Sequence, residues 1–124
     1  MSKILLVEDN PMNRDMLSRR LIRRGFEVVC AEDGESVFGL LEAENPALVL
    51  MDISLPGIDG LETTRRIRSD DRFKGLPIIA LTAHAFQSDE IEARAAGCDD
   101  FETKPIELDR LLEKIGELLK KNAS

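Results

Sequence analysis

The amino-acid sequence predicts an α/β fold, in which helices cover both faces of a doubly wound, five-stranded parallel sheet. Two observations predict it. Short apolar runs alternate along the chain with segments of helical period, and the runs are continuously apolar, as in strands buried on both faces. Because crossovers between parallel strands are right-handed, helices then fall on both sides of the sheet. No Gly/Ser-rich or Pro-rich linker divides the 124 residues, so we expect one domain.

The first strand is expected over residues 4–7, where an apolar run stops at two acidic residues. A helix follows it. Asn10 is a suitable N-cap, Pro11 fits the first helical turn and Gly25 ends the segment. A second strand is expected over residues 26–31. The buried face of the first helix is expected to hold Met16, Leu17 and Leu21.

The middle of the chain repeats this order of strand and helix. The second helix is expected to open at Asp33-Gly34, and its apolar positions are Val37, Leu40 and Leu41. The third strand, 47–52, precedes a helix in which Asp59 and Glu62 have capping-box spacing.

Two further strands, 77–82 and 99–104, complete the predicted sheet. Between them we expect a helix from about residue 88 to residue 96, which Gly97 ends as a left-handed cap. A last helix closes the domain near Lys121. Its broad apolar stripe contains Leu108, Leu111, Leu112, Ile115, Leu118 and Leu119.

Charge and cysteine content exclude several classes of protein. A net charge of −7 argues against nonspecific nucleic-acid binding. The arginines of the first helix are therefore read as a solvated face; they are Arg14, Arg19, Arg20, Arg23 and Arg24. Cys30 and Cys98 lack the spacing of a zinc or redox motif, so we expect reduced, mostly buried thiols. No signal peptide or membrane-spanning run is found, which predicts a cytoplasmic protein without membrane insertion.

Polar residues follow four of the predicted strands at the point where each strand ends. In doubly wound sheets the functional site lies at the carboxyl ends of the strands. We therefore expect one shared site that contains Glu8, Asp9, Asp52, Thr82 and Lys104. Taken singly, Asp52 is equally well explained as the first residue of a turn, so the prediction depends on the whole set.

The chemistry of that set favours uptake of a phosphoryl group. Neighbouring carboxylates repel each other by roughly 4 kcal/mol per close pair at an effective dielectric constant near 20, so a divalent cation such as Mg²⁺ is expected beside them. Lys104 adds a fixed positive charge, and Thr82 a hydroxyl donor. The cations offset charge on the transferring oxygens while the carboxylate of Asp52 attacks.

Four segments resemble, in order and spacing, the response-regulator receiver domain of two-component signalling. They are "LLVEDN", "LVLMDISLPGIDG", "IIALTAHA" and "AAGCDDFETKPI". The resemblance covers essentially the whole chain. It implies a flavodoxin-like sheet with strand order 2-1-3-4-5. It also implies a chemotaxis-regulator-like or cell-division-regulator-like protein, with a receiver domain over 1–121, a short tail over 122–124 and no effector domain.

The same resemblance implies a role for each site residue. Asp52 would be the phosphoacceptor, and Thr82 and Lys104 would contact the phosphoryl oxygens. Mg²⁺, or Mn²⁺ in its place, would bind Asp9, Asp52 and the backbone carbonyl of Ser54, with Glu8 acting through water. The bond before Pro105 corresponds to the family's cis peptide.

Three positions carry further expectations. Phe101 matches the aromatic switch position of the family, which is often Tyr; a plain core phenylalanine is the alternative. Ser54 and His84 match variable positions that tune the lifetime of the acyl phosphate, and a neutral loop histidine is the alternative for His84. Arg19, Arg23 and the off-stripe Ile22 are weaker candidates for docking a phosphodonor.

The predicted function is a phosphorylation-switched signalling module, not an enzyme beyond self-catalysed phosphoryl transfer and autodephosphorylation. Its partners would be a sensor histidine kinase or a histidine phosphotransfer protein, and a downstream protein bound by the fourth helix, fifth strand and last helix.

A receiver excised from a hybrid kinase is a second interpretation, and a phosphorylation-independent receiver is a third. An Mg²⁺-dependent phosphohydrolase with an aspartyl nucleophile is disfavoured, because such enzymes have a second Asp where this chain has Ser54. A flavin-binding protein of the same topology is also disfavoured. It would need a hydroxyl- and glycine-rich loop after the first strand, where this chain has the acidic segment "VEDNPMN".

Overall fold

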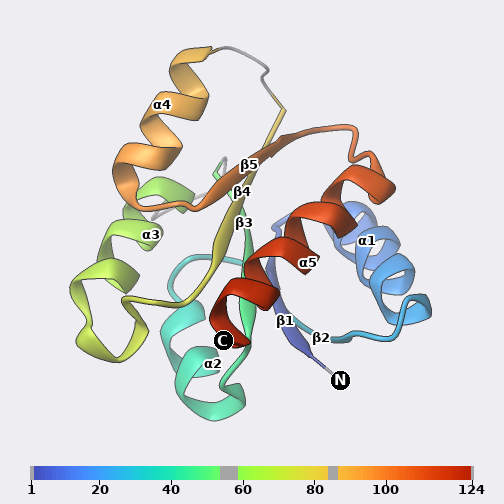
Figure 1. Ribbon diagram of the computed structural model, residues 1–124, viewed down its shortest axis with the longest axis horizontal. Helices are drawn as coiled ribbons and strands as arrows, with labels where there is room; N and C mark the ends of the chain where they lie inside the picture. Colours follow the sequence, from blue (N-terminus) through green and yellow to red (C-terminus); the bar gives the residue numbers. More distant parts are fainter. Residues whose placement is uncertain (1, 54–58, 84–86, 124) are drawn as a thin grey trace.

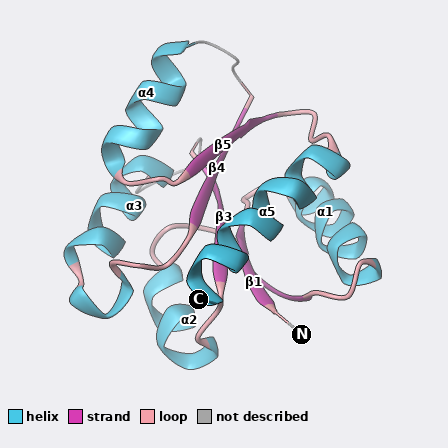
Figure 2. Cartoon of the chain, in the orientation of Figure 1, coloured by secondary structure: helices cyan, strands magenta, loops and turns pink. Residues whose placement is uncertain are grey.

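The computed structural model describes residues 2–53, 59–83 and 87–123. Its centre is a parallel sheet with the strand order β2-β1-β3-β4-β5 (Figures 1 and 2). The strands are β1 (Lys3–Val7), β2 (Glu27–Ala31), β3 (Leu48–Asp52), β4 (Ile78–Thr82) and β5 (Asp100–Thr103). The predicted fold class and strand order are therefore confirmed.

Five helices and a short 3₁₀ turn surround the sheet in the described part of the chain. They are α1 (Pro11–Arg23), α2 (Val37–Glu44), α3 (Gly60–Ser69), η1 (Asp71–Phe73), α4 (Gln87–Ala96) and α5 (Leu108–Ala123). Helices α1 and α5 cover one face of the sheet, and α2, α3 and α4 cover the other (Figure 1). Among the described residues, no helix combines the length and apolar character needed to cross a bilayer.

The core consists of two apolar layers, one on each face of the sheet. Every residue of β3 and β4 is buried, because helices cover both faces of these central strands. Alternate strand residues face opposite layers: Leu5 and Val49 pack with α2 and α3, whereas Leu6 and Leu50 pack with α1 and α5. This packing fixes the carboxyl ends of β1, β3 and β4 side by side.

Local signals position most helix ends as the sequence predicts. The Asn10 side chain accepts hydrogen bonds from the backbone N–H groups of Met12 and Asn13, which caps α1. Asp59 caps α3 by accepting the N–H of Glu62 at 2.8 Å. Gly97, at φ 118°, ends α4 in the left-handed region, as expected.

Two helix ends differ from the prediction by more than one residue. Helix α2 begins at Val37 rather than at Asp33-Gly34, because the Asp33 carboxylate accepts the N–H of Ser36 and holds a separate turn ahead of the helix. Helix α5 continues to Ala123, past the expected end near Lys121.

Three side-chain placements also correct the prediction. Met16 is 51% exposed, since the buried stripe of α1 runs through Leu17 and Leu21 and leaves Met16 beside it. Cys30 is exposed because it lies on the edge strand β2, whereas Cys98 is buried as expected. Arg14 is half-buried rather than solvated, because its guanidinium donates to the backbone carbonyl of Glu8 at 2.9 Å.

Candidate functional site

Asp52 is the last residue of the buried central strand β3, and its side chain is buried. The start of α3 lies directly against it. A Cβ on Gly60 would come within 2.3 Å of the backbone oxygen of Asp52 and 2.6 Å of the Cα of Ile53. Only glycine permits this approach, so Gly60 allows the start of α3 to lie against the backbone of Asp52.

Two acidic residues at the end of β1 join Asp52. Carboxylate oxygens of Glu8, Asp9 and Asp52 all lie within 4.8 Å of one another, and we call these three residues the acidic cluster. Glu8 is buried, and its Oε1 accepts the N–H of Asn10 at 3.2 Å. Asp9 is exposed, so the acidic cluster opens to solvent on its side.

Lys104 follows β5 and reaches across the sheet to the acidic cluster. Its Nζ donates to Oε2 of Glu8 at 2.8 Å and to Oδ2 of Asp52 at 3.1 Å. The Lys104-Pro105 peptide bond is cis, as predicted. Residues far apart in the sequence thus meet at the carboxyl edge of the sheet, where the chain order predicted them.

The electrostatics of the acidic cluster favour an added cation. Burial and the neighbouring Asp52 raise the pKa of Glu8, although Lys104 and the N–H of Asn10 oppose this. Burial alone would lower the pKa of Lys104, but Glu8 and Asp52 outweigh it and raise that pKa. Three carboxylates face one ammonium group, and their hard oxygen ligands fit Mg²⁺.

Thr82 lies on β4, the strand next to that of Asp52, and Phe101 lies on β5, one strand further along the sheet. Thr82 ends β4, is buried, and its backbone carbonyl accepts the N–H of Lys104 at 2.6 Å. Phe101 is 9% exposed and packs with Ala93 and Cys98, so its ring belongs to the layer under α4. The remaining predicted site residues, Ser54 and His84, lie outside the described residues.

A cavity of about 470 Å³ opens beside the site, between α1 and the segment after β5. Glu8 and Lys104 line its polar end. Its other walls are mostly apolar and include Met16, Leu17, Leu81, Pro105 and Ile106. Two polar residues of α1, Asn13 and Arg20, also line it. The acidic cluster therefore borders a surface hollow that a second molecule can enter.

Gly60 and a third buried carboxylate, Glu102, were not predicted from the sequence. Glu102 lies on β5 and is 3% exposed, paired with Arg110 and Lys114 of α5. A signal for it exists in the sequence. An acidic residue interrupts an otherwise strand-like segment, and two basic residues follow it at i, i+4 spacing on the next helix.

Comparisons with known proteins agree with this geometry. The model of the response regulator receiver domain family matches residues 4–116. The polar-differentiation response regulator DivK of Brucella anthropi is 35% identical over 116 residues, which is 94% of each chain. DivK of Brucella ovis is 34% identical over the same length and share of each chain.

Solved structures show the same fold. A putative response regulator from Chloroflexus aurantiacus has a TM-score of 0.92 and 33% identity, covering 96% of this chain and 98% of its own. The receiver domain of the sensor histidine kinase PA1611 from Pseudomonas aeruginosa, solved with magnesium in its active-site cleft, has a TM-score of 0.88 and 35% identity, with 96% and 98% covered.

The receiver domain of Ssk1 from Saccharomyces cerevisiae, solved in complex with the histidine phosphotransfer protein Ypd1, has a TM-score of 0.90 and 30% identity, covering 99% of this chain and 92% of its own. Fold, acidic cluster and sequence similarity thus agree. The chain belongs to the response regulator receiver domain family of two-component signalling systems.

Proposed function

We propose that Asp52 accepts a phosphoryl group from a phosphohistidine of a partner protein, and that the aspartyl phosphate changes which proteins this chain binds. One observation carries the proposal: a buried carboxylate at the end of a central strand lies against an ammonium group and two further carboxylates. Receiver domains are signalling phosphoacceptors, and this arrangement supplies what an acceptor needs.

The phosphoryl group would pass directly from the partner's histidine to Asp52. An Oδ atom of Asp52 attacks phosphorus, the P–N bond to the partner's imidazole breaks, and the imidazole nitrogen keeps the electron pair and takes up a proton. Lys104 offsets the negative charge on the phosphoryl oxygens, and Thr82 donates its hydroxyl to one of them. Asp9, Asp52 and the carbonyl of Ser54 would hold Mg²⁺, or Mn²⁺ in its place, with Glu8 bound through water. The ion would neutralise the phosphoryl oxygens during transfer.

Four residues would detect the phosphorylated state or end it. Thr82 moves toward the phosphoryl group, and Phe101 follows it by changing its packing under α4. Ser54 and His84 set how fast the acyl phosphate hydrolyses through autodephosphorylation. Exchanging either of them for Ala changes the dephosphorylation rate of the isolated protein.

Two surfaces would serve two kinds of partner. A sensor histidine kinase or phosphotransfer protein would approach beside α1, where the apolar cavity meets the acidic cluster and where Arg19, Arg23 and Ile22 are exposed. The Ssk1 receiver was solved in complex with the histidine phosphotransfer protein Ypd1, which supports this class of donor. A downstream protein would bind the face formed by α4, β5 and α5. The proposed setting is cytoplasmic, with residues 1–121 as the receiver unit.

The test is incubation with phosphoramidate and Mg²⁺, followed by intact mass measurement. Wild-type protein is expected to gain one phosphoryl adduct, and removal of Mg²⁺ with EDTA suppresses it. Asp52→Asn forms none, whereas the control Asp71→Asn, at an exposed carboxylate in η1, labels like the wild type. A wild type without an adduct, or an undiminished adduct on Asp52→Asn, contradicts the proposal.

A further inference from the structure

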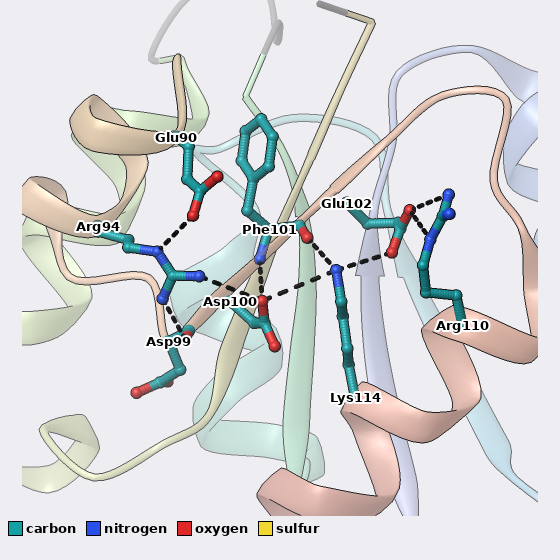
Figure 3. A network of polar contacts seen from close by, with 8 residues as sticks. All are labelled: Glu90, Arg94, Asp99, Asp100, Phe101, Glu102, Arg110 and Lys114. Atoms are coloured by element: carbon teal, nitrogen blue, oxygen red, sulfur yellow. Dashed lines mark hydrogen bonds and ion pairs between the residues drawn. The ribbon is translucent and has the colours of Figure 1, made fainter. Parts of the chain in front are cut away.

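The α5 side of β5 holds a buried ionic contact that the phosphorylation chemistry does not use. Glu102 accepts two contacts through Oε1 from Arg110, at 2.9 Å from Nε and 2.8 Å from Nη2. Its Oε2 lies 2.9 Å from Nζ of Lys114 as an ion pair, without a hydrogen bond of good geometry. Both cations belong to α5, so one carboxylate on the strand holds two successive turns of the helix (Figure 3).

Lys114 contacts three consecutive residues of β5. Its Nζ donates to the backbone carbonyl of Phe101, pairs with Glu102 and lies 3.8 Å from Oδ1 of Asp100. The ring of Phe101 points away from these contacts (Figure 3) and packs in the layer under α4. Lys114 therefore holds the backbone of the residue whose ring lies on the opposite side of the strand.

The polar contacts that Arg94 of α4 makes at the start of β5 are more exposed than the pair formed by Lys114 and Glu102. Arg94 of α4 donates to the carbonyl of Asp99 at 3.0 Å and to Oδ1 of Asp100 at 3.4 Å (Figure 3). The side chain of Arg94 is 47% exposed, whereas that of Lys114 is 25% exposed and that of Glu102 2%. Solvent therefore screens the Arg94 contact more than the pair of Lys114 and Glu102.

We propose that Lys114 and Glu102 are a positioning pair that makes β5 and α5 move together, so that a change at Phe101 reaches the surface of α5. The proposal rests on the proposed function of Asp52. The remaining contacts of α5 with the sheet include the buried side chains of Leu111 and Ile115. Apolar contacts are non-directional and tolerate sliding, whereas hydrogen bonds and buried ion pairs do not.

The buried position of Glu102 makes the coupling obligatory. Its carboxylate cannot move away from its cations without leaving a charge unpaired inside the protein. If the backbone of β5 shifts when Phe101 repacks, the ammonium group of Lys114 follows, and the helix turn that carries it follows as well. Lys114 and Glu102 touch neither Asp52 nor Lys104 among the described contacts, so the phosphorylation step itself is independent of the pair.

The test uses the isotopically labelled full chain with beryllofluoride and Mg²⁺ as the probe. Amide shifts are followed by NMR at Gly60, beside Asp52, and at Gly116, on α5. In wild-type protein both amides are expected to shift. In Lys114→Met the Gly116 shift falls to less than half, the Gly60 shift stays, and Lys114→Arg restores most of the response at Gly116.

Lys120→Met is the matched control, because it makes the same change at an exposed lysine of the same helix; it is expected to shift like the wild type. The double variant Glu102→Leu/Lys114→Met replaces the pair by apolar atoms and keeps the fold, so loss of its Gly116 shift is not due to unfolding. A full Gly116 shift in this variant overturns the coupling. A wild type that forms no adduct and shows no Gly60 shift overturns the proposed function instead, and the coupling with it.

Discussion

The protein contains two buried carboxylate sites that differ in charge balance. At the acidic cluster, three carboxylates share the single ammonium group of Lys104. On the α5 side of β5, two cations surround the one carboxylate of Glu102. Burial and Asp52 raise the pKa of Glu8, whereas burial is outweighed by Arg110 and Lys114 at Glu102, and the pKa of Glu102 falls. An uncompensated site can take up a cation and a phosphoryl group, and a compensated site holds two elements together.

The largest expected effect on stability comes from removing the two cations that pair with Glu102. Arg110→Leu/Lys114→Met leaves a buried carboxylate without a cation, and we expect a loss of about 3–5 kcal/mol in the free energy of unfolding at pH 7. Urea denaturation followed by circular dichroism measures it. Adding Glu102→Leu should recover most of the loss. A change below about 1 kcal/mol in the double variant would show that the contact is no stronger than a surface pair.

A steric change tests what holds the acidic cluster in place. Gly60→Ala puts a Cβ against backbone atoms of Asp52 and Ile53, and we expect a loss of about 3 kcal/mol in the free energy of unfolding. The matched control is Gly39→Ala in α2, where a Cβ meets open space and should stabilise the helix by about 0.5–1 kcal/mol. Equal effects of the two substitutions in urea denaturation would contradict the claim that the fold requires glycine at position 60.

The pH dependence of the two sites should have opposite signs. Because the folded state raises the pKa of Glu8, its contribution to stability is present in acid and is lost as pH rises through the folded pKa. Glu8→Gln should therefore stabilise the protein by about 1 kcal/mol at pH 7 and by nothing in acid.

Glu102 follows the reverse rule. Its folded pKa is lowered, so its contribution is present above the unfolded pKa and is lost as pH falls through the folded one. Glu102→Gln should cost about 1 kcal/mol at pH 7, and less as the pH falls through that range. Urea denaturation between pH 3 and about 8 measures both variants. The same sign for both at pH 7 would show that the two sites do not differ in charge balance.

The smallest expected effect comes from an exposed ion pair, which shows how much less such a pair contributes to the free energy of unfolding than a buried one. Glu90 and Arg94 form an ion pair on the outside of α4 with about half of each side chain exposed. Glu90→Gln should change the free energy of unfolding by only about 0.3–0.5 kcal/mol, and the change should vanish in high salt. A larger, salt-insensitive loss would mean that exposure is a poor guide to the difference between the two buried sites.

Sequence patterns predicted the fold and the acidic cluster for definite physical reasons. Short continuous apolar runs that alternate with helical segments are typical of strands covered on both faces, and parallel strands bring their carboxyl ends together. Asp52, Asp9 and Lys104 were therefore placed correctly without coordinates. Errors occurred where one helical position decides exposure, as at Met16, or where the sheet edge does, as at Cys30.

The sequence by itself determined which residues reach the carboxyl edge of the sheet, because strand period, strand end and chain order are local properties. Only the tertiary structure decided that Lys104 bridges Glu8 and Asp52, that Gly60 approaches the backbone of Asp52, and that Glu102 is buried between two cations of α5. Each of these depends on the distance between elements far apart in the chain. Side-chain packing across the sheet sets that distance, and no local pattern encodes it.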